Sequence, residues 1–592
     1  MPPVMDRSFT SVIRWLFLPE DGPGNRLLPR WLFLRGLGLI YFSAFYPLLF
    51  QIKGLIGPDG ILPTQDYLEA LAKMGLKRFW YAPTLFWFAS GSHMLMAVCW
   101  VGLAAAILLL LNVWPRATLA ICFICFLSFV SAAQDFSGYQ SDGMLLEAGF
   151  ISLFFAPAGV RPGLGRHSLP IRASLFLLQW EWFRIYFESG VVKLASGEPQ
   201  WRNFTAMDEY YQNGPLPTWI GWYVQHLPHW FHAFTTGATL ALELFLVWSL
   251  FLPRRWRIAC FFIVTLWQLP VTLTANYTFL NYLVLLLGVL LLDDEFLQRC
   301  LPKHLLPGKA AAGDMPPNLR SVSPDTAQAA LDPKSDSAES ISPGGEGALS
   351  QNNVLARPLA TSIGNRSREA QSEADPADGA PEKFGSPIQV VKLALTSVIL
   401  GWIFYATTVQ LLWILLPWLP LPRSPVVALD PCRIANRYGL FAVMTRGRYE
   451  IEFQGSNDGE TWTAYKFRYK PQDLSVAPRI YAPYQPRFEW NLWFASLDTW
   501  RDNMFVVSTQ ERLLANNHDV LALFTGNPFG DAPAKQVRAV IWEYWFTSLE
   551  EKRATGRWWR RKFLGLYAPT LTYLPDGRLG VLEWPPQMMP RP

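Results

Sequence analysis

The stretch Trp180–Asn203 is apolar enough to span a bilayer, yet four charged side chains lie within its first 14 residues. These are Glu181, Arg184, Glu188 and Lys193. A charge near the bilayer centre costs at least ~2.5–3.5 kcal/mol on insertion scales, so the four need partners or positions near the interfaces. The first three are spaced i, i+3 and i+7 and therefore share one helix face. We expect this face to point into a helix bundle, where the carboxylates flank the guanidinium group.

Glu147 adds a further charge, because it lies inside the apolar run MLLEAGF. We expect it to pair with Arg184 or Lys193 and so to complete an intramembrane charge cluster. Buried pairs of this kind serve structure as well as function, and the sequence leaves both roles open.

Several apolar runs of about 18 residues make the chain a polytopic membrane protein. Of its 592 residues, 51% are hydrophobic and 15% are aromatic, which is unusual for a soluble protein of this size. The net charge of +5 is small for this length and gives no nucleic-acid signature. We predict about nine spans, at residues 31–50, 93–111, 118–133, 143–157, 172–194, 231–252, 258–275, 278–292 and 390–418.

Loop charges predict the orientation of these spans. With the N-terminus in the cytoplasm, the loops 134–142 and 275–278 face outward and carry no Lys or Arg. The cytoplasmic loops then follow the positive-inside rule, and the exception is the outer segment 51–92, which carries Lys53, Lys73, Lys77 and Arg78. The basic residues of the cytoplasmic loops are Arg116, then Arg161, Arg166 and Arg172, then Arg254, Arg255 and Arg257. We expect no cleavable signal peptide, so the first span acts as the signal anchor.

The chain divides by composition into five segments. From His304 to Lys383 it contains no Phe, Trp or Tyr, which is typical of a disordered linker. The segments are a cytoplasmic N-terminal segment 1–30, a transmembrane bundle 31–300 with an aromatic outer loop 195–230, a disordered cytoplasmic linker 301–386, a final transmembrane helix 387–420, and a β-rich soluble domain 425–592 on the outer face.

The last segment shows the alternation of a β domain. Tyr449, Ile451 and Phe453 alternate with charged residues, and the run 465–469 alternates in the same way. Between these runs, Asn457–Gly459 supplies hairpin-turn chemistry. We expect an all-β or α+β domain with an antiparallel, sandwich-like sheet, helical pieces over 498–515 and a strand over 537–547.

Familiar catalytic signatures are missing from the sequence, which has no GxSxG, HExxH or P-loop motif. Three histidines, His226, His229 and His232, suggest a metal site, but no acidic or Cys ligand joins them at a familiar spacing. The sequence therefore predicts neither a metal nor a cofactor.

Long ordered motifs resemble the lipase maturation factor family over most of the chain outside the linker. They are GLIGPDGILP, QDFSGYQSDGMLLEAGF, FRIYFESGVVKLASGEPQWRN, ANYTFLNYLV, NRYGLFAVMTRGRYEIEFQGSNDGETW, YAPYQPRFEWNLWFA, GNPF and GRWWRRK. The resemblance implies a membrane-anchored factor that helps secreted lipases fold and assemble. The membrane is then the endoplasmic reticulum in a eukaryote. In a bacterium, which the short termini favour, it is the inner membrane.

Under this resemblance, segment 425–592 is a lumenal or periplasmic client-binding domain. The implied partners are secreted clients, lipases above all, together with membrane lipid. Tryptophan is enriched at interaction hot spots but also fills cores. The candidates for client contact are Trp462, Trp490, Trp493, Trp545, Trp558 and Trp559.

A fainter resemblance supports an alternative function. GVVKLASGEPQW is similar to a stretch of vitamin K-dependent gamma-carboxylase, in which a lysine acts as a base. That lysine corresponds to Lys193, with Glu188 or Glu147 as further candidate catalytic residues. A lysine at a span end also has a structural explanation, because it can snorkel to the interface.

Overall fold

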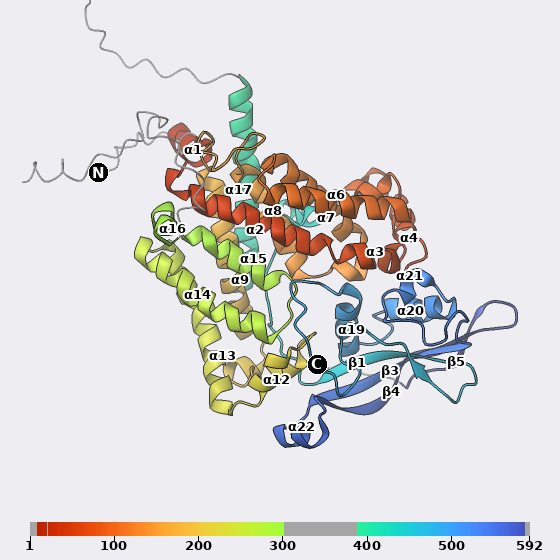
Figure 1. The fold of residues 1–592 in the computed structure, drawn as a ribbon. Helices are drawn as coiled ribbons and strands as arrows, with labels where there is room; N and C mark the ends of the chain where they lie inside the picture. Colours follow the sequence, from red (N-terminus) through yellow and green to blue (C-terminus); the bar gives the residue numbers. More distant parts are fainter. Residues whose placement is uncertain (1–8, 20–21, 301–386, 587–592) are drawn as a thin grey trace, which may run out of the picture. The chain divides into compact units, whose positions relative to one another are not determined.

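The computed structural model describes residues 9–19, 22–300 and 387–586. Helices form the N-terminal part, and a long helix precedes an antiparallel sheet with further helices (Figure 1). The predicted linker 301–386 and part of the predicted segment 1–30 lie outside the described residues.

The helices before the linker are mostly apolar, and each predicted span coincides with a helix or with a helix and its continuation. Their bounds are α1 Phe9–Phe17, α2 Leu27–Phe45, α3 Leu48–Ile56, α4 Thr64–Ala72, α5 Arg78–Tyr81, α6 Ser92–Leu110, α7 Pro115–Ala132, α8 Gln140–Phe155, α9 Arg172–Ala195, α10 Pro199–Arg202, α11 Tyr210–Asn213, α12 Trp219–Gln225, α13 His229–Leu244, α14 Arg254–Thr274, α15 Leu280–Gly288 and α16 Asp294–Cys300. The 3-10 turns η6 Leu246–Phe251 and η7 Val289–Leu291 continue α13 and α15.

The predicted count of nine spans is not confirmed. Five helices of the described residues are long and apolar enough to cross a membrane: α6, α7, α13 with η6, α14, and α17 (Pro387–Leu415). Counting the bent pair α2–α3 as one span gives six. By contrast, α8 has only 16 residues, and α9 carries too many charges to be recognised by hydropathy.

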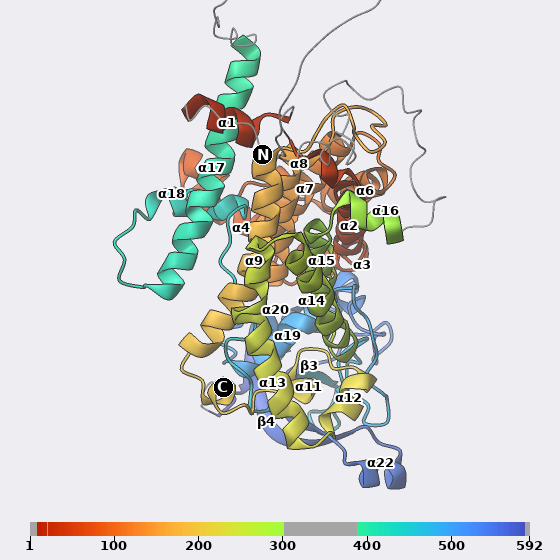
Figure 2. The same ribbon diagram turned by 90° about the vertical axis from the view of Figure 1, so that its left-hand side faces the viewer.

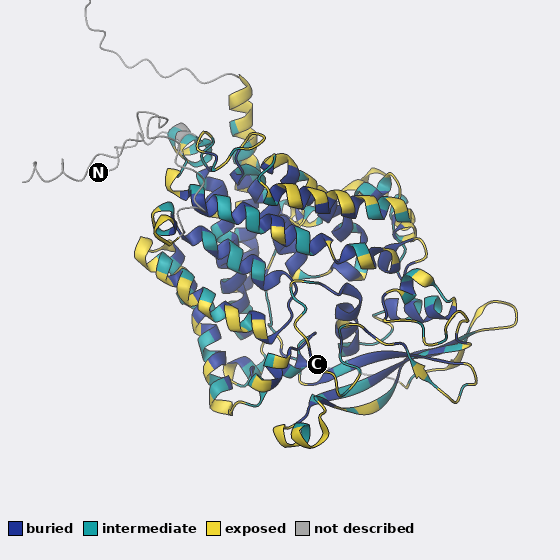
Figure 3. Ribbon diagram, viewed as in Figure 1, coloured by how far each residue is buried: buried dark blue, intermediate teal, exposed yellow. Residues whose placement is uncertain are grey.

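Helix α9 lies at the centre of the helical part and packs against α8, α13, α15 and α17 (Figure 2). Its polar residues Glu181, Arg184 and Glu188 are completely buried, as the predicted inward-facing charged face requires. The outward faces of α6 and α14 are instead exposed and apolar (Figure 3). This distribution is typical of a membrane bundle, in which polar residues face the protein interior and apolar residues face lipid.

The C-terminal part contains a five-stranded antiparallel sheet in the order β2-β1-β3-β4-β5. The strands are β1 Arg448–Ser456, β2 Thr463–Ala464, β3 Gln536–Phe546, β4 Trp559–Tyr573 and β5 Leu579–Glu583. The helices are α18 Ser424–Val427, α19 Arg487–Leu497, α20 Phe505–Leu514, α21 His518–Leu521 and α22 Leu549–Thr555. An antiparallel sheet was expected, and the predicted strands at 449–453 and 537–547 are present.

Helices, rather than a second sheet, cover the inner face of this sheet in the described residues. Helix α19 packs on β1, and α20 packs on β3 and β4. The arrangement is therefore α+β, and the sandwich-like second layer is helical. Helix α20 falls within the helical stretch expected over 498–515, whereas α19 was not predicted.

The predicted strand at 465–469 is not a strand. Side chains alternate between buried and exposed there, with Tyr465 and Phe467 buried. The backbone N–H groups from Arg468 to Lys470 donate to a carboxylate and not to a neighbouring strand. Glu489 on α19 accepts hydrogen bonds from Arg468 N at 2.8 Å, Tyr469 N at 2.8 Å and Lys470 N at 2.6 Å.

Several buried polar contacts join this sheet domain to the helical part, among them those of Arg487 and Asn276. Arg487 at the start of α19 forms a bidentate pair with Asp142 of α8, with N–O distances of 2.7 and 2.9 Å. Asn276, just after α14, accepts hydrogen bonds from Tyr481 N and Ala482 N at 2.6 and 3.0 Å. Both contacts lie at the same end of the helices, so the sheet domain caps that end (Figures 1 and 2).

The buried Glu489 carboxyl generates a pH prediction. Desolvation raises its pKa from 4.5 to about 7, against the opposing effect of the three N–H donors. When the pKa of a carboxyl is higher in the folded state than in the unfolded state, the protein loses stability as the pH rises from the unfolded-state pKa to the folded-state pKa. In the wild type, this effect lowers the free energy of unfolding by about 3 kcal/mol between pH 4.5 and 7, and we expect Glu489→Gln to remove it. The measurement is the unfolding midpoint of the purified protein against pH.

The matched control is Glu460→Gln, on the exposed turn after β1. This variant should keep the wild-type pH profile. If Glu489→Gln shows the same slope as the wild type between pH 4.5 and 7, Glu489 does not titrate in this range.

Candidate functional site

The candidate site is built around a segment that has no regular secondary structure, residues 434–441, which we call the inserted segment. It follows α17 and contacts the interior of the helical part before β1 begins. Gln410 of α17 donates to Ala435 O at 3.2 Å, and Trp201 of the aromatic loop donates to Phe441 O at 3.0 Å. Its two ends are thus held by elements far apart in the sequence.

Carboxylates of α8 and α9 bind the backbone of the inserted segment. Glu147 accepts from Asn436 N at 2.8 Å, and Glu188 accepts from Tyr438 N at 2.7 Å. Arg184 donates to Asn436 O at 2.6 Å. Each charged side chain therefore binds a backbone group that the segment, being neither helix nor strand, leaves unpaired.

Tyr438 lies at the centre of these charges. Its hydroxyl lies 2.9 Å from a Glu147 oxygen and 3.4 Å from a Glu181 oxygen, and its ring faces the Arg184 guanidinium at 5.1 Å. Arg184 also forms ion pairs with Glu147 and, at 3.7 Å, with Glu188. The predicted partner choice for Glu147 is therefore resolved in favour of Arg184.

These contacts give the buried charges a physical role. Irregular backbone inside a membrane protein is stable only where protein groups satisfy its N–H and C=O groups. A buried charge in turn needs both an opposite charge and hydrogen bonds to offset its desolvation. In this cluster one set of contacts meets both needs, because the carboxylates bind the Arg184 guanidinium and the inserted backbone together.

Lys193 lies outside this cluster and pairs with a different acid. Its ammonium group lies 2.8 Å from both carboxylate oxygens of Glu243 on α13, and 5.0 Å from the Trp201 ring centre. The two charged side chains are only 2% and 12% exposed. The lysine is thus held inside the protein by an ion pair.

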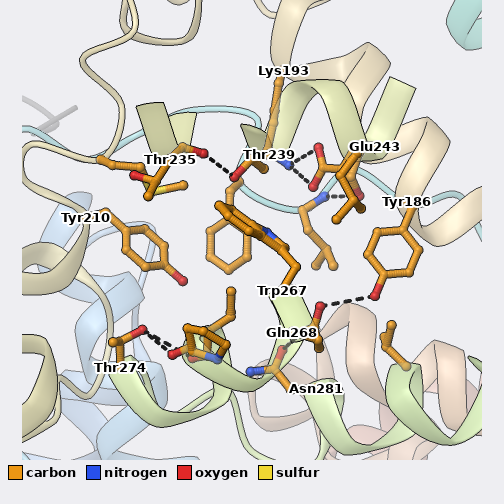
Figure 4. A pocket seen from close by; sticks show the side chains of 18 of the residues that line it. Tyr186, Lys193, Tyr210, Thr235, Thr239, Glu243, Trp267, Gln268, Thr274 and Asn281 are labelled. Atoms are coloured by element: carbon orange, nitrogen blue, oxygen red, sulfur yellow. Dashed lines mark hydrogen bonds and ion pairs between the residues drawn. The ribbon is translucent and has the colours of Figure 1, made fainter. Parts of the chain in front are cut away.

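A cavity of about 350 Å³ lies beside this pair (Figure 4). Its walls come from α9, α13, α14, α15, the aromatic loop and the inserted segment. Most of the lining is apolar or aromatic, as in Tyr210, Trp267 and Phe441. The size and lining match those of small-molecule sites, which are mainly apolar clefts of ≈ 300–1,000 Å³.

The six tryptophans proposed for client contact differ in accessibility. Trp490, Trp493 and Trp559 are buried, whereas Trp462, Trp545 and Trp558 are partly exposed. Trp462 and Trp559 also line a polar cleft of about 680 Å³ on the sheet domain.

The three histidines of the aromatic loop do not meet. His226 contacts the carbonyl oxygens of Trp222 and Thr547, and His229 contacts Asp208. His232 is buried apart from them. Among the described residues, no group of three or more His, Cys, Asp or Glu side chains is arranged to hold a metal ion.

Two family models match the chain. The lipase maturation factor transmembrane domain matches residues 28–299, and the lipase maturation factor C-terminal domain matches residues 434–569. Lipase maturation factor 2 of Gallus gallus is 31% identical over 92% of this chain and 81% of its own length. The chain belongs to the lipase maturation factor family.

Other members of the family show the same extent of similarity. Lipase maturation factor 2 of Homo sapiens is 30% identical over 93% of this chain and 83% of its own length. Lipase maturation factor 1 of Bos taurus is 29% identical over 93% of this chain and 90% of its own length. No solved structure matches the chain. These relatives are named as maturation factors, and they give no support to a carboxylase-type enzyme.

Three residues of the site were missed by the sequence reasoning. Asn436 and Tyr438 lie in NRYGLF, a motif that carries the family resemblance, but nothing in its local pattern shows that it enters the bundle. Glu243 left a clearer signal, because it is the one carboxylate in the apolar stretch 231–252 and needs an intramembrane partner.

The Lys193–Glu243 pair generates a stability prediction for this family member. Lys193→Met leaves the Glu243 carboxylate without its partner, and breaking a buried pair in this way costs about 3–5 kcal/mol. Combining it with Glu243→Leu removes both charges and should restore most of the stability. The measurement is the unfolding midpoint of the detergent-purified protein.

A matched control comes from an exposed pair, Arg299–Glu295 on α16, with an N–O distance of 2.5 Å. Removing one partner of a helix-surface pair changes stability by only about 0.3–0.5 kcal/mol, so Arg299→Met should behave as the wild type. A Lys193→Met protein as stable as Arg299→Met contradicts the assignment of the pair as a structural contact.

Proposed function

We propose that this protein is a membrane-anchored maturation factor that helps secreted proteins fold and assemble, with lipases as its clients. Its membership of the lipase maturation factor family supports this proposal, as do the names of its relatives. Such a factor binds apolar surface that an unassembled client exposes, and so lowers the population that aggregates.

The sheet domain lies on the lumenal or periplasmic side in this proposal, where secreted clients fold. The basic loops support this orientation. Arg30 bonds to the carbonyl oxygen of Ser168, Arg116 to that of Ala156 and Arg257 to that of Leu291, which gathers these loops at one end of the helices. The sheet domain contacts the other end, and the positive-inside rule assigns the basic end to the cytoplasm.

The observation that carries the proposal is the exposed apolar strand β5 at the edge of the sheet. Val581 and Leu582 point to opposite faces, as neighbours in a strand do, and both are exposed. The next aromatic residue, Trp584, is 62% exposed. An uncovered apolar edge strand is a template for pairing with an extended chain, and recognition by strand addition uses this geometry.

Partly exposed tryptophans extend the proposed client surface. Trp462, Trp545 and Trp558 are all partly exposed on the same domain. Arg538 and Lys552 lie over Trp462 and Trp558, at 3.9 and 3.5 Å from the ring centres. Trp490, Trp493 and Trp559 are buried and are not part of this surface.

No catalytic step is part of this proposal. Glu147 and Glu188 bind the inserted segment, and Lys193 pairs with Glu243, so the geometry gives each of these side chains a structural partner. The compartment follows the host, and is the endoplasmic reticulum membrane in a eukaryote or the inner membrane in a bacterium.

Placing charges on β5 tests the proposal. Val581→Lys with Leu582→Lys should leave the fold intact, because both side chains are exposed, but should oppose pairing with an apolar client segment, as charges on natural edge strands do. We expect a severalfold loss of secreted, active dimeric lipase from cells that carry this protein as their only maturation factor.

The control is Leu549→Lys, an exposed apolar residue on α22 away from the sheet edge. It should mature the lipase as the wild type does, with both proteins at equal levels in the membrane. Full lipase activity in cells that carry the Val581→Lys, Leu582→Lys variant would contradict the assignment of β5 as the client-binding element.

A further inference from the structure

The cavity beside the Lys193–Glu243 pair lies within the half of the bundle that adjoins the sheet domain. On α13 its lining extends from Phe231 to Glu243, a distance of about 18 Å at 1.5 Å per residue. The hydrocarbon core of a bilayer is about 30 Å thick. The lining along α13 is therefore about as long as one leaflet, and a bilayer around the bundle would place the cavity in the leaflet next to the sheet domain.

The polar side chains that reach the cavity already have partners within the protein. Lys193 pairs with Glu243, and Thr239 donates to a carbonyl oxygen of its own helix at 2.8 Å. Gln268 accepts from Tyr186 at 3.1 Å and donates to Asn281 at 2.9 Å (Figure 4). An occupant therefore needs no hydrogen-bonding group along its length, which favours a plain hydrocarbon chain.

The cavity reaches the outer surface of the bundle between α13 and α14. Phe234 of α13 and Pro270 of α14 both line it and are both exposed, Phe234 to 65%. The neighbouring outer face of α14 carries exposed apolar residues such as Leu266 and Leu269, as expected of a helix surface that faces lipid. If the cavity were empty, the side chains of its walls would lack dispersion contacts on one side. A lipid chain next to the opening can supply those contacts.

We propose that this cavity binds one acyl chain of a membrane lipid, which enters sideways between α13 and α14 while its headgroup stays at the interface. The site is distinct from the client surface on β5, and it does not rest on the proposed function. Because Leu440 and Phe441 of the inserted segment form part of its wall, the bound chain also contacts the segment that joins the two parts of the protein.

Photo-crosslinking of the full-length protein in vesicles tests this inference. One arm uses phosphatidylcholine with a diazirine in its acyl chain, and the other uses a diazirine-bearing palmitic acid. Labelled peptides are then mapped by mass spectrometry. Labelling by the first probe at the cavity residues of α9, α13 and α14 identifies membrane phospholipid as the source, whereas cavity labelling by the fatty acid alone identifies free fatty acid.

Two variants fill the cavity without removing contacts between elements. Thr239→Phe loses only a hydrogen bond within α13, and Val271→Phe enlarges an apolar side chain near the mouth. The larger side chain and the acyl chain would compete for the same space, and the cost of overpacking corresponds to about a tenfold change in the binding constant. Cavity labelling should therefore fall about tenfold in each variant. Leu266→Phe is the matched control, because it lies on the lipid-facing surface of α14, 71% exposed and outside the cavity.

Labelling spread evenly over the lipid-facing helices, with no excess at the cavity, overturns the proposal. Unchanged cavity labelling in both filled variants, with unfolding midpoints like that of the wild type, does the same. Because the readout is lipid labelling, neither result depends on whether the protein matures a lipase.

Discussion

The binding of the inserted segment by carboxylates of α8 and α9 is the interaction on which the rest of the structure depends. A stretch of coil passes among helices, and the N–H groups of Asn436 and Tyr438 bond to Glu147 and Glu188. The same carboxylates share Arg184, so removing either one leaves a backbone N–H group without its acceptor and leaves Arg184 with a single acidic partner. Charges that look costly in an isolated span are thus part of the contact between the bundle and the sheet domain.

This contact has consequences for how the protein can work. The sheet domain is held by the inserted segment, by the Asp142–Arg487 pair and by the hydrogen bonds of Asn276. It therefore presents β5 at a fixed place relative to the end of the bundle rather than on a free tether. A client held on β5 would remain close to the membrane surface, and the acyl-chain cavity lies directly behind the inserted segment.

Sequence patterns predicted what depends on local spacing. The long apolar helices, the strands at 449–453 and 537–547, and the shared face of Glu181, Arg184 and Glu188 all follow from local hydropathy or spacing. The partners of these charges did not, because Tyr438 is 250 residues from Glu188 in the chain and its contact is set by tertiary packing. The run 465–469 alternates like a strand, but the Glu489 carboxylate binds its backbone from Arg468 to Lys470, and no local pattern predicts such a contact.

Hydrogen exchange of the inserted segment tests the central claim most directly. Coil exposed to water exchanges its amide protons quickly, whereas amides buried in hydrogen bonds exchange only on opening of the structure. In the detergent-purified protein, a peptide covering residues 434–441 should exchange as slowly as the buried faces of α8 and α9. Exchange at the rate of an open loop, with the helices still protected, would contradict the account.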